Sequence, residues 1–204
     1  MKSTRITVTS GGLGMRDALD MTEKLGAESG LGEKENLHLR LLAEELFGML
    51  RSIAGDVEAG YWLEFEKKAF ELHMDAYITL TQEMRQQLLD VSTTGKNAAA
   101  KGLMGKIRDM IALKLLPTEE GPSDLALALM NVAWSSPTGN RIGNVAAEWS
   151  MNQYKSEVKS SGAQGADVEA ARDELEKSIV ANVADEVRIG IVGSNVEITI
   201  FKAF

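Results

Sequence analysis

Two adjacent carboxylates, Glu44 and Glu45, lie inside the apolar segment LRLLAEELFGMLRSIAG, which runs from Leu39 to Gly55. Apolar residues recur in this segment at intervals of three and four, which predicts an amphipathic helix that ends at Gly55. Successive residues of a helix point about 100° apart, so only one of the two glutamates can face a given pocket. A carboxylate that faces a pocket is a candidate general base, whereas a glutamate at a helix edge commonly pairs with an arginine or with water. Both roles fit the pair.

Asp75 and a glycine–lysine segment are two further candidates for ligand binding. Asp75 interrupts the alternation of apolar and polar residues between Phe70 and Leu80, where a carboxylate either faces water or accepts a hydrogen bond from a ligand. The segment STTGKNAAAKGLMG, from Ser92 to Gly105, precedes a predicted helix from Lys106 to Leu116. Glycines let the backbone approach a ligand, and free N–H groups at a helix N-terminus favour an anion such as phosphate. The lysines of this segment also fit an ordinary exposed basic face.

Composition argues against several other chemistries. The chain has no cysteine, so it has no disulfide and no thiolate that could act as nucleophile or metal ligand. The histidines, His38 and His73, have no ligand spacing around them, so we expect core or surface roles for them and no metal site. The glycine cluster from Gly11 to Gly14 resembles half of a dinucleotide fingerprint, but no parallel βαβ pattern follows it.

The bulk properties predict a soluble, cytoplasmic protein. The chain has 204 residues, of which 44% are hydrophobic and 25% charged, and this fits one globular domain. Its formal net charge of -8 argues against a nucleic-acid partner, because phosphate binding needs a basic face. No stretch approaches the roughly 20 apolar residues of a membrane-spanning helix, and the N-terminal residues lack the apolar core of a signal peptide.

The elements that must position the candidate residues follow a recognisable order. Alternation and helical spacing predict a strand at Arg5–Thr9, helices at Leu13–Glu28 and Leu39–Gly55, and a hairpin of Tyr61–Lys67 with Phe70–Leu80. We expect a short helix that begins at Thr81, before the glycine–lysine segment. Pro117 opens an insertion that runs to Ala184, with helices expected at Leu125–Trp134, Asn144–Ser160 and Asp167–Val183. Residues Asp185–Phe204 read as a second hairpin, and we expect it to join the sheet of the first, because a lone hairpin is marginal in water.

In order and spacing, these features resemble the histidine-kinase-like ATPase family, the GHKL or Bergerat fold, and most closely its small anti-sigma-factor serine kinases. The resemblance covers Arg5 to Leu116 and resumes at Asp185 to Phe204. The helix that carries Glu45 resembles the family's first motif helix, in which a Glu acts as general base. LHMDAYI, around Asp75, sits where the family has its Asp-x-Gly-x-Gly adenine site, and GKNAAAKGLMG resembles the ATP lid and its closing glycine motif.

The resemblance implies a fold, a cofactor and a set of site residues. It implies an α/β fold, a two-layer sandwich of one mixed sheet with helices on one face, as a single domain from 1 to 204 with a helical insertion at about 117–184. It implies ATP as the cofactor and Glu45 as the catalytic base. The residues that it assigns to ATP binding are Asp75, Gly95, Lys96, Lys101, Gly102 and Gly105.

Two departures from the family pattern bear on catalysis. The family places an Asn four residues after the Glu to hold Mg²⁺, but here Glu44 is followed at that spacing by Gly48 and Glu45 by Met49. Neither residue supplies the oxygen ligand that Mg²⁺ requires. No glycine follows Asp75 in the second motif. We therefore expect weak ATP binding that is largely independent of Mg²⁺, and negligible turnover.

Two functions of different classes fit these features. One is a divergent ATP-binding regulatory protein of the anti-sigma type, which if active would be a serine protein kinase or an ATPase. The alternative is a non-catalytic scaffold of the same fold that acts through protein–protein contact. Both imply a regulatory protein as partner. The insertion carries Trp134, Trp149 and Tyr154, and such aromatic residues serve as packing or interface anchors. We therefore expect the insertion helices either to cover the open region beside the lid or to make a homodimer contact.

Overall fold

The computed structural model describes residues 1–53, 57–78, 147–160, 173, 175–192 and 194–204, and in these residues one six-stranded sheet carries the fold. The strand order is β1-β2-β3-β6-β5-β4, and every neighbouring pair is antiparallel. The strands are β1 (Ile6–Thr9), β2 (Glu58–Glu66), β3 (Ala69–Tyr77), β4 (Ala147–Ser150), β5 (Glu186–Val192) and β6 (Asn195–Ala203). The helices are α1 (Met15–Glu28), α2 (Glu33–Ile53), α6 (Met151–Ser160) and α8 (Ile179–Val183).

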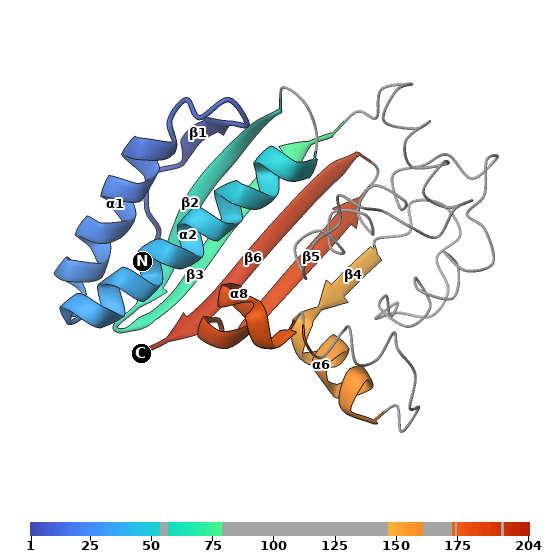
Figure 1. The fold of residues 1–204 in the computed structure, drawn as a ribbon. Helices are drawn as coiled ribbons and strands as arrows, with labels where there is room; N and C mark the ends of the chain where they lie inside the picture. The colour runs from blue at the N-terminus through green and yellow to red at the C-terminus, as the bar shows by residue number, and fades with distance from the viewer. Residues whose placement is uncertain (54–56, 79–146, 161–172, 174, 193) are drawn as a thin grey trace.

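The expected α/β architecture is confirmed in its coarse form. Figure 1 shows α1 and α2 side by side across one face of the sheet, with α8 beyond α2 on the same side. The expectation of a mixed sheet is wrong for the described strands, because all five of their pairings are antiparallel. Two of these pairings, β2–β3 and β5–β6, follow from their connections, because a hairpin can join only antiparallel strands.

The second hairpin returns to the sheet of the first, as the sequence predicted. β3 pairs with β6 along its whole length, from Ala69 opposite Ala203 to Tyr77 opposite Asn195. The first hairpin turns at Lys67, whose φ of 56° is left-handed, and this places Phe65 opposite Phe70. A register shift of one residue would exchange the two faces of the sheet, so this turn decides which side chains reach the core.

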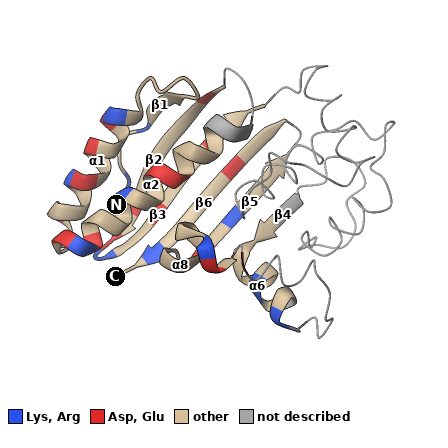
Figure 2. Cartoon of the chain, viewed as in Figure 1, with Lys and Arg blue, Asp and Glu red and all other residues tan. Residues whose placement is uncertain are grey.

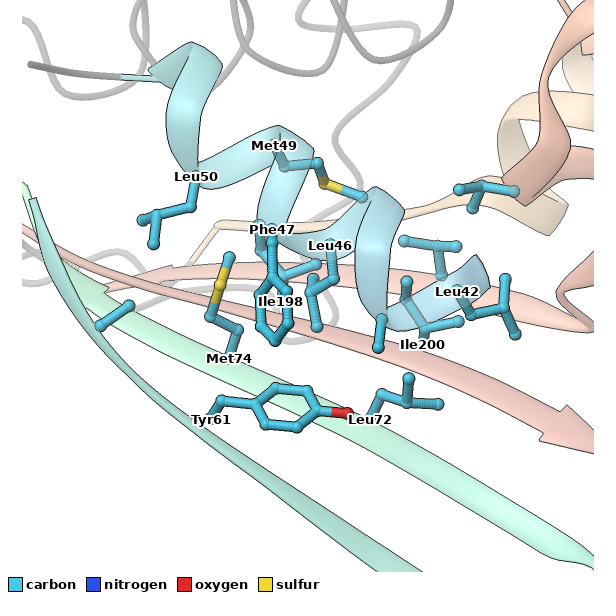
Figure 3. Packing of buried hydrophobic residues seen from close by; sticks show 14 of the residues in the cluster. Leu42, Leu46, Phe47, Met49, Leu50, Tyr61, Leu72, Met74, Ile198 and Ile200 are labelled. Carbon is cyan, nitrogen blue, oxygen red and sulfur yellow. The ribbon is translucent and has the colours of Figure 1, made fainter. Parts of the chain in front are cut away.

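The core lies between α2 and the sheet. Leu42, Leu46 and Met49 of α2 are at most 2% exposed and recur at helical spacing. Figure 3 shows them above alternate residues of three strands, which include Tyr61, Leu72, Met74, Ile198 and Ile200. Burying a side chain of this size stabilises the fold by about 1.5–3 kcal/mol relative to leaving it in water. The apolar stripe of α2 is therefore accounted for by packing.

Two helix boundaries differ from those expected. α2 begins at Glu33, inside a segment expected to be a loop, because the Glu35 carboxylate accepts a hydrogen bond from Gly32 N at 2.8 Å and satisfies a free N–H of the first turn. The helix expected over Asp167–Val183 is interrupted at Ser178, which has an extended conformation. The Ser178 hydroxyl accepts from Ala181 N and caps the short helix α8.

The helix expected over Asn144–Ser160 is wrong at its start. Residues Ala147–Ser150 form β4, which pairs with β5 at the edge of the sheet, and α6 begins only at Met151. Trp149 is 1% exposed and lies in the core, where its ring is 6.0 Å from that of Tyr154. Sheet pairing and burial of the indole outweigh a weak helical pattern. These two aromatic residues therefore pack within the chain, whereas Trp134 and the helices expected at 106–116 and 125–134 lie outside the described residues.

Candidate functional site

Glu44 belongs to an ion-pair network between α1 and α2. Its carboxylate accepts a hydrogen bond from Arg40 Nε at 2.8 Å, and Arg40 also donates to Glu23 of α1 at 2.7 Å. These hydrogen bonds raise the pKa of the Arg40 guanidinium, Glu23 contributing most and Glu44 next. Figure 2 shows acidic and basic residues interspersed along α1, which suits such pairing. Glu44 therefore has the structural role of a helix-edge glutamate.

Glu45, unlike Glu44, has no side-chain partner among the described residues. It is half-buried on α2, and the described residues supply no hydrogen bond or ion pair to it. Burial raises the pKa of the Glu45 carboxyl, and the neighbouring charge of Glu44 raises it further. A carboxyl with a raised pKa is suited to accept a proton, which fits the role expected of Glu45.

The residue one helical turn beyond Glu45 offers no metal ligand. Met49 is 2% exposed and its thioether lies in the core, whereas Mg²⁺ takes oxygen ligands in near-octahedral geometry. Gly48, one turn beyond Glu44, is exposed and has open space around it. A Mg²⁺–phosphate site of the kind that the ATPase family has therefore does not fit the described part of α2.

Asp75 lies on the opposite side of the sheet from Glu45. Its neighbours Met74 and Ala76 are buried on the helix face, so the Asp75 side chain points to the face opposite α1 and α2, which we call the far face. There Arg5 Nη2 donates to the Asp75 carboxylate at 2.5 Å. The structure does not bring the two expected site carboxylates together.

Arg5 is held against the far face by three features of the sheet. Its guanidinium lies 5.0 Å from the ring centre of Trp62, in cation–π geometry, and pairs with Asp75. A Cβ at Gly60 would lie 2.1 Å from Arg5 Nε, so glycine is needed for the guanidinium to lie flat on the strand. A polar cavity of about 240 Å³ adjoins the pair and is lined by Thr7, Glu58, Tyr77 and Asn195 as well.

The far face also carries a cluster that sequence reasoning missed, formed by Glu64, Glu71 and His73, which we call the His73 cluster. One ligand-type atom from each of the three side chains lies within 4.8 Å of the others. The signal was present in the hairpin: the turn at Lys67 places Glu64 opposite Glu71, and His73 follows Glu71 by two residues on the same face. Reading the register across the hairpin, rather than spacing along the chain, would have found it.

The glycine–lysine segment cannot be placed in this site. Gly95, Lys96, Lys101, Gly102 and Gly105 lie outside the described residues, so their expected contacts with ATP stay predictions. A membrane-spanning helix is not found among the helices that the structure describes.

Comparisons with known proteins assign no family to the chain, so the fold alone defines its structural class. No family model matches the sequence, and neither a curated protein nor a solved structure shows significant similarity to the chain. In its described residues the protein is an α/β protein, an open six-stranded antiparallel sheet with two long helices packed on one face.

Proposed function

We propose that this protein is a regulatory protein with the architecture of a histidine-kinase-like ATPase domain, and that it acts by binding a protein partner without transferring phosphate. The observation that carries the proposal is the position of Glu45. The only carboxylate of α2 suited to act as base is followed one turn later by Met49 in the core, where phosphoryl transfer would need a Mg²⁺ ligand.

The order of elements supports descent from that family. A strand, two helices and a hairpin come first, and a second hairpin returns beside the first after a long intervening segment. This order of elements is the one that the sequence resemblance implies, although the described sheet is antiparallel and not mixed. The pairing of Asp75 with Arg5 on the far face removes the expected adenine contact from the side of the sheet that carries Glu45, and this supports loss of catalysis.

Exposed apolar side chains on the far face support a protein partner. Tyr77 and Val192 are 71% and 51% exposed, and they flank Asn195 in one row across β3, β6 and β5. Exposed aromatic and aliphatic side chains on one face are of the kind that protein partners cover.

Weak ATP binding is the second candidate, and one observation favours it. Glu45 is a half-buried carboxylate without a hydrogen-bond partner among the described residues, so it is available to a ligand. A polyphosphate beside Glu45 would be repelled by its charge, so binding would depend on the base and on the lysines expected in the lid.

Titration calorimetry with ATP, in Mg²⁺ and in excess chelator, tests both candidates together with a phosphate-release assay. We expect no detectable turnover, and any ATP affinity should change by less than about twofold between the two conditions. If triphosphate lies beside Glu45, Glu45→Gln should tighten binding, whereas the matched control Glu44→Gln should not. Tight binding that the chelator abolishes, or measurable phosphate release, would contradict the proposal.

A further inference from the structure

We propose that Glu64, Glu71 and His73 on the far face of the sheet bind a divalent transition-metal ion. The chemistry of these donors selects Zn²⁺. This inference is independent of the proposed regulatory function. It departs from the expectation that neither histidine binds a metal.

The first support is a buried nitrogen that lacks a partner. His73 is 9% exposed, and its Nε2 atom is buried without a hydrogen-bond partner among the described residues. Leaving a buried polar atom unsatisfied is costly, and a bound ion is one way in which native proteins satisfy such an atom. Nε2 points toward the carboxylates of the His73 cluster, so a cation bound there would satisfy it.

The distances within the cluster suit a shared ion. His73 Nε2 lies 3.4 Å from Glu71 Oε2, which is longer than a good hydrogen bond of about 2.7–3.2 Å. Two ligands of one tetrahedral Zn²⁺, each bonded at about 2.0–2.1 Å, lie about 3.3 Å apart. The Glu64 carboxylate offers an oxygen within 4.8 Å of both atoms and is the third candidate ligand. Water would take the fourth position.

The other nitrogen of His73, Nδ1, and the imidazole ring are held by neighbouring side chains. Nδ1 lies 3.2 Å from Thr199 Oγ1, and the imidazole stacks on Trp62 with ring centres 4.9 Å apart and planes within 2°. When Nδ1 donates its proton to Thr199, the lone pair is left on Nε2, which is the arrangement that a metal-binding imidazole needs. The stacking holds the ring at an angle that aims Nε2 at the two glutamates.

Glu64 is shared with a neighbouring cation. Its Oε1 accepts hydrogen bonds from Lys2 Nζ at 2.8 Å and from Trp62 Nε1 at 3.3 Å. Both bonds go to one oxygen, so Oε2 is the oxygen available to an ion. The positive charge of Lys2 opposes a second cation nearby, so removing it should strengthen metal binding.

The donor set selects the class of metal. One imidazole nitrogen and two carboxylate oxygens suit Zn²⁺ and related transition metals, whereas Ca²⁺ and Mg²⁺ take oxygen ligands throughout. Zn²⁺ should therefore bind under conditions in which equal Ca²⁺ or Mg²⁺ gives no signal.

Calorimetric titration of Zn²⁺ into the full chain, without an affinity tag and stripped with chelator, tests the proposal. We expect one site in the wild type, weakened by at least about tenfold in Glu71→Gln and in His73→Gln. Lys2→Met should tighten the site. The matched control is Glu66→Gln, which removes an exposed carboxylate from the same face of β2 outside the cluster, and it should leave the affinity within about twofold.

A thermal melt with Zn²⁺ provides a second test of the site. Zn²⁺ should raise the melting temperature of the wild type but not of Glu71→Gln, because only a ligand that binds the folded state stabilises it. The side chain of Glu71 is 45% exposed, so this variant should fold even if the substitution of buried His73 does not. Equal Zn²⁺ affinity in wild type and Glu71→Gln, or no binding by the wild type at millimolar Zn²⁺, would overturn the assignment.

Discussion

At the residue scale, neighbouring side chains of the same type have different roles because their surroundings differ. Glu44 pairs with Arg40, whereas Glu45, the next residue, is half-buried without a partner in the described residues. The histidines His38 and His73 differ in the same way: only His73 stacks on a tryptophan beside two carboxylates. Residue type and spacing in the sequence do not distinguish the two members of each pair. Their burial and their partners in the structure do.

The pH dependence of stability should reveal Glu45. Burial raises the pKa of Glu45 in the folded state above its unfolded value, so its stabilising contribution is present in acid and is lost as the pH rises through the folded pKa. Glu45→Gln should therefore raise the melting temperature by a few degrees at pH 7, and the gain should shrink towards about pH 4, where the unfolded carboxyl is largely protonated.

Thermal melts of both glutamate variants across this range make the comparison. Glu44→Gln removes the attraction to Arg40 and should lower the unfolding free energy slightly, by about 0.3–0.5 kcal/mol at neutral pH. A gain for Glu45→Gln that is the same at both pH values would show that burial of its charge is not the cause.

At the element scale, glycines on the two long helices have opposite roles. A Cβ at Gly26 of α1 would lie 2.1 Å from Asn36 Oδ1 and 3.2 Å from Leu39 Cδ2, both on α2. The Asn36 amide donates to the Glu23 carbonyl at 3.0 Å, so it cannot move away without losing a bond between the helices. Gly26 therefore sets how closely α1 approaches α2, whereas Gly48 has open space around it.

Alanine substitutions at these glycines should change stability in opposite directions. Gly48→Ala should stabilise the fold by about 0.5–1 kcal/mol, because alanine restricts the unfolded chain and favours the helix. Gly26→Ala gains the same helix propensity but forces the helices apart, so we expect a net loss of about 1–3 kcal/mol. Urea unfolding followed by circular dichroism measures both. A stabilised Gly26→Ala variant would contradict the close helix contact.

At the scale of the whole molecule, one core joins segments that are distant in the sequence. Leu46 of α2 packs in the same cluster as Leu72 of β3 and Ile198 and Ile200 of β6. β6 lies beside β3 although more than a hundred residues separate them in the chain. The first and last hairpins should therefore unfold together.

Truncating Leu46 should test this shared core. Leu46 is fully buried, so Leu46→Ala should cost about 2–5 kcal/mol in unfolding free energy. Leu37, on the same helix, is 54% exposed, and Leu37→Ala should change stability by less than about 0.5 kcal/mol. Urea unfolding followed by tryptophan fluorescence and by circular dichroism should give coincident transitions for Leu46→Ala. Two separate transitions would show that the hairpins do not share one cooperative core.

The local elements could be predicted from the sequence because they depend on local patterns. Alternation of apolar and polar residues identified β2, β3, β5 and β6, and the spacing of Leu42, Leu46 and Met49 identified α2. The instability of a lone hairpin was enough to predict that β6 joins β3. The strand β4 was missed because its four residues, AEWS, lack the β-branched residues that marked β1, and only the free edge of β5 makes them a strand.

The candidate sites depended on the tertiary structure. The sequence identified Glu45 and Asp75 as candidate site residues and gave His73 only a core or surface role, but it does not show which side of a sheet or helix each one faces. Packing of Met74 and Ala76 against the helices turns Asp75 to the far face, where Arg5 pairs with it. The register of the first hairpin places Glu64 beside His73, on the face of β2 and β3 that points away from the core. Side-chain alternation along a strand is local, but which of the two faces becomes the core is decided by what packs on it, and that is a property of the whole chain.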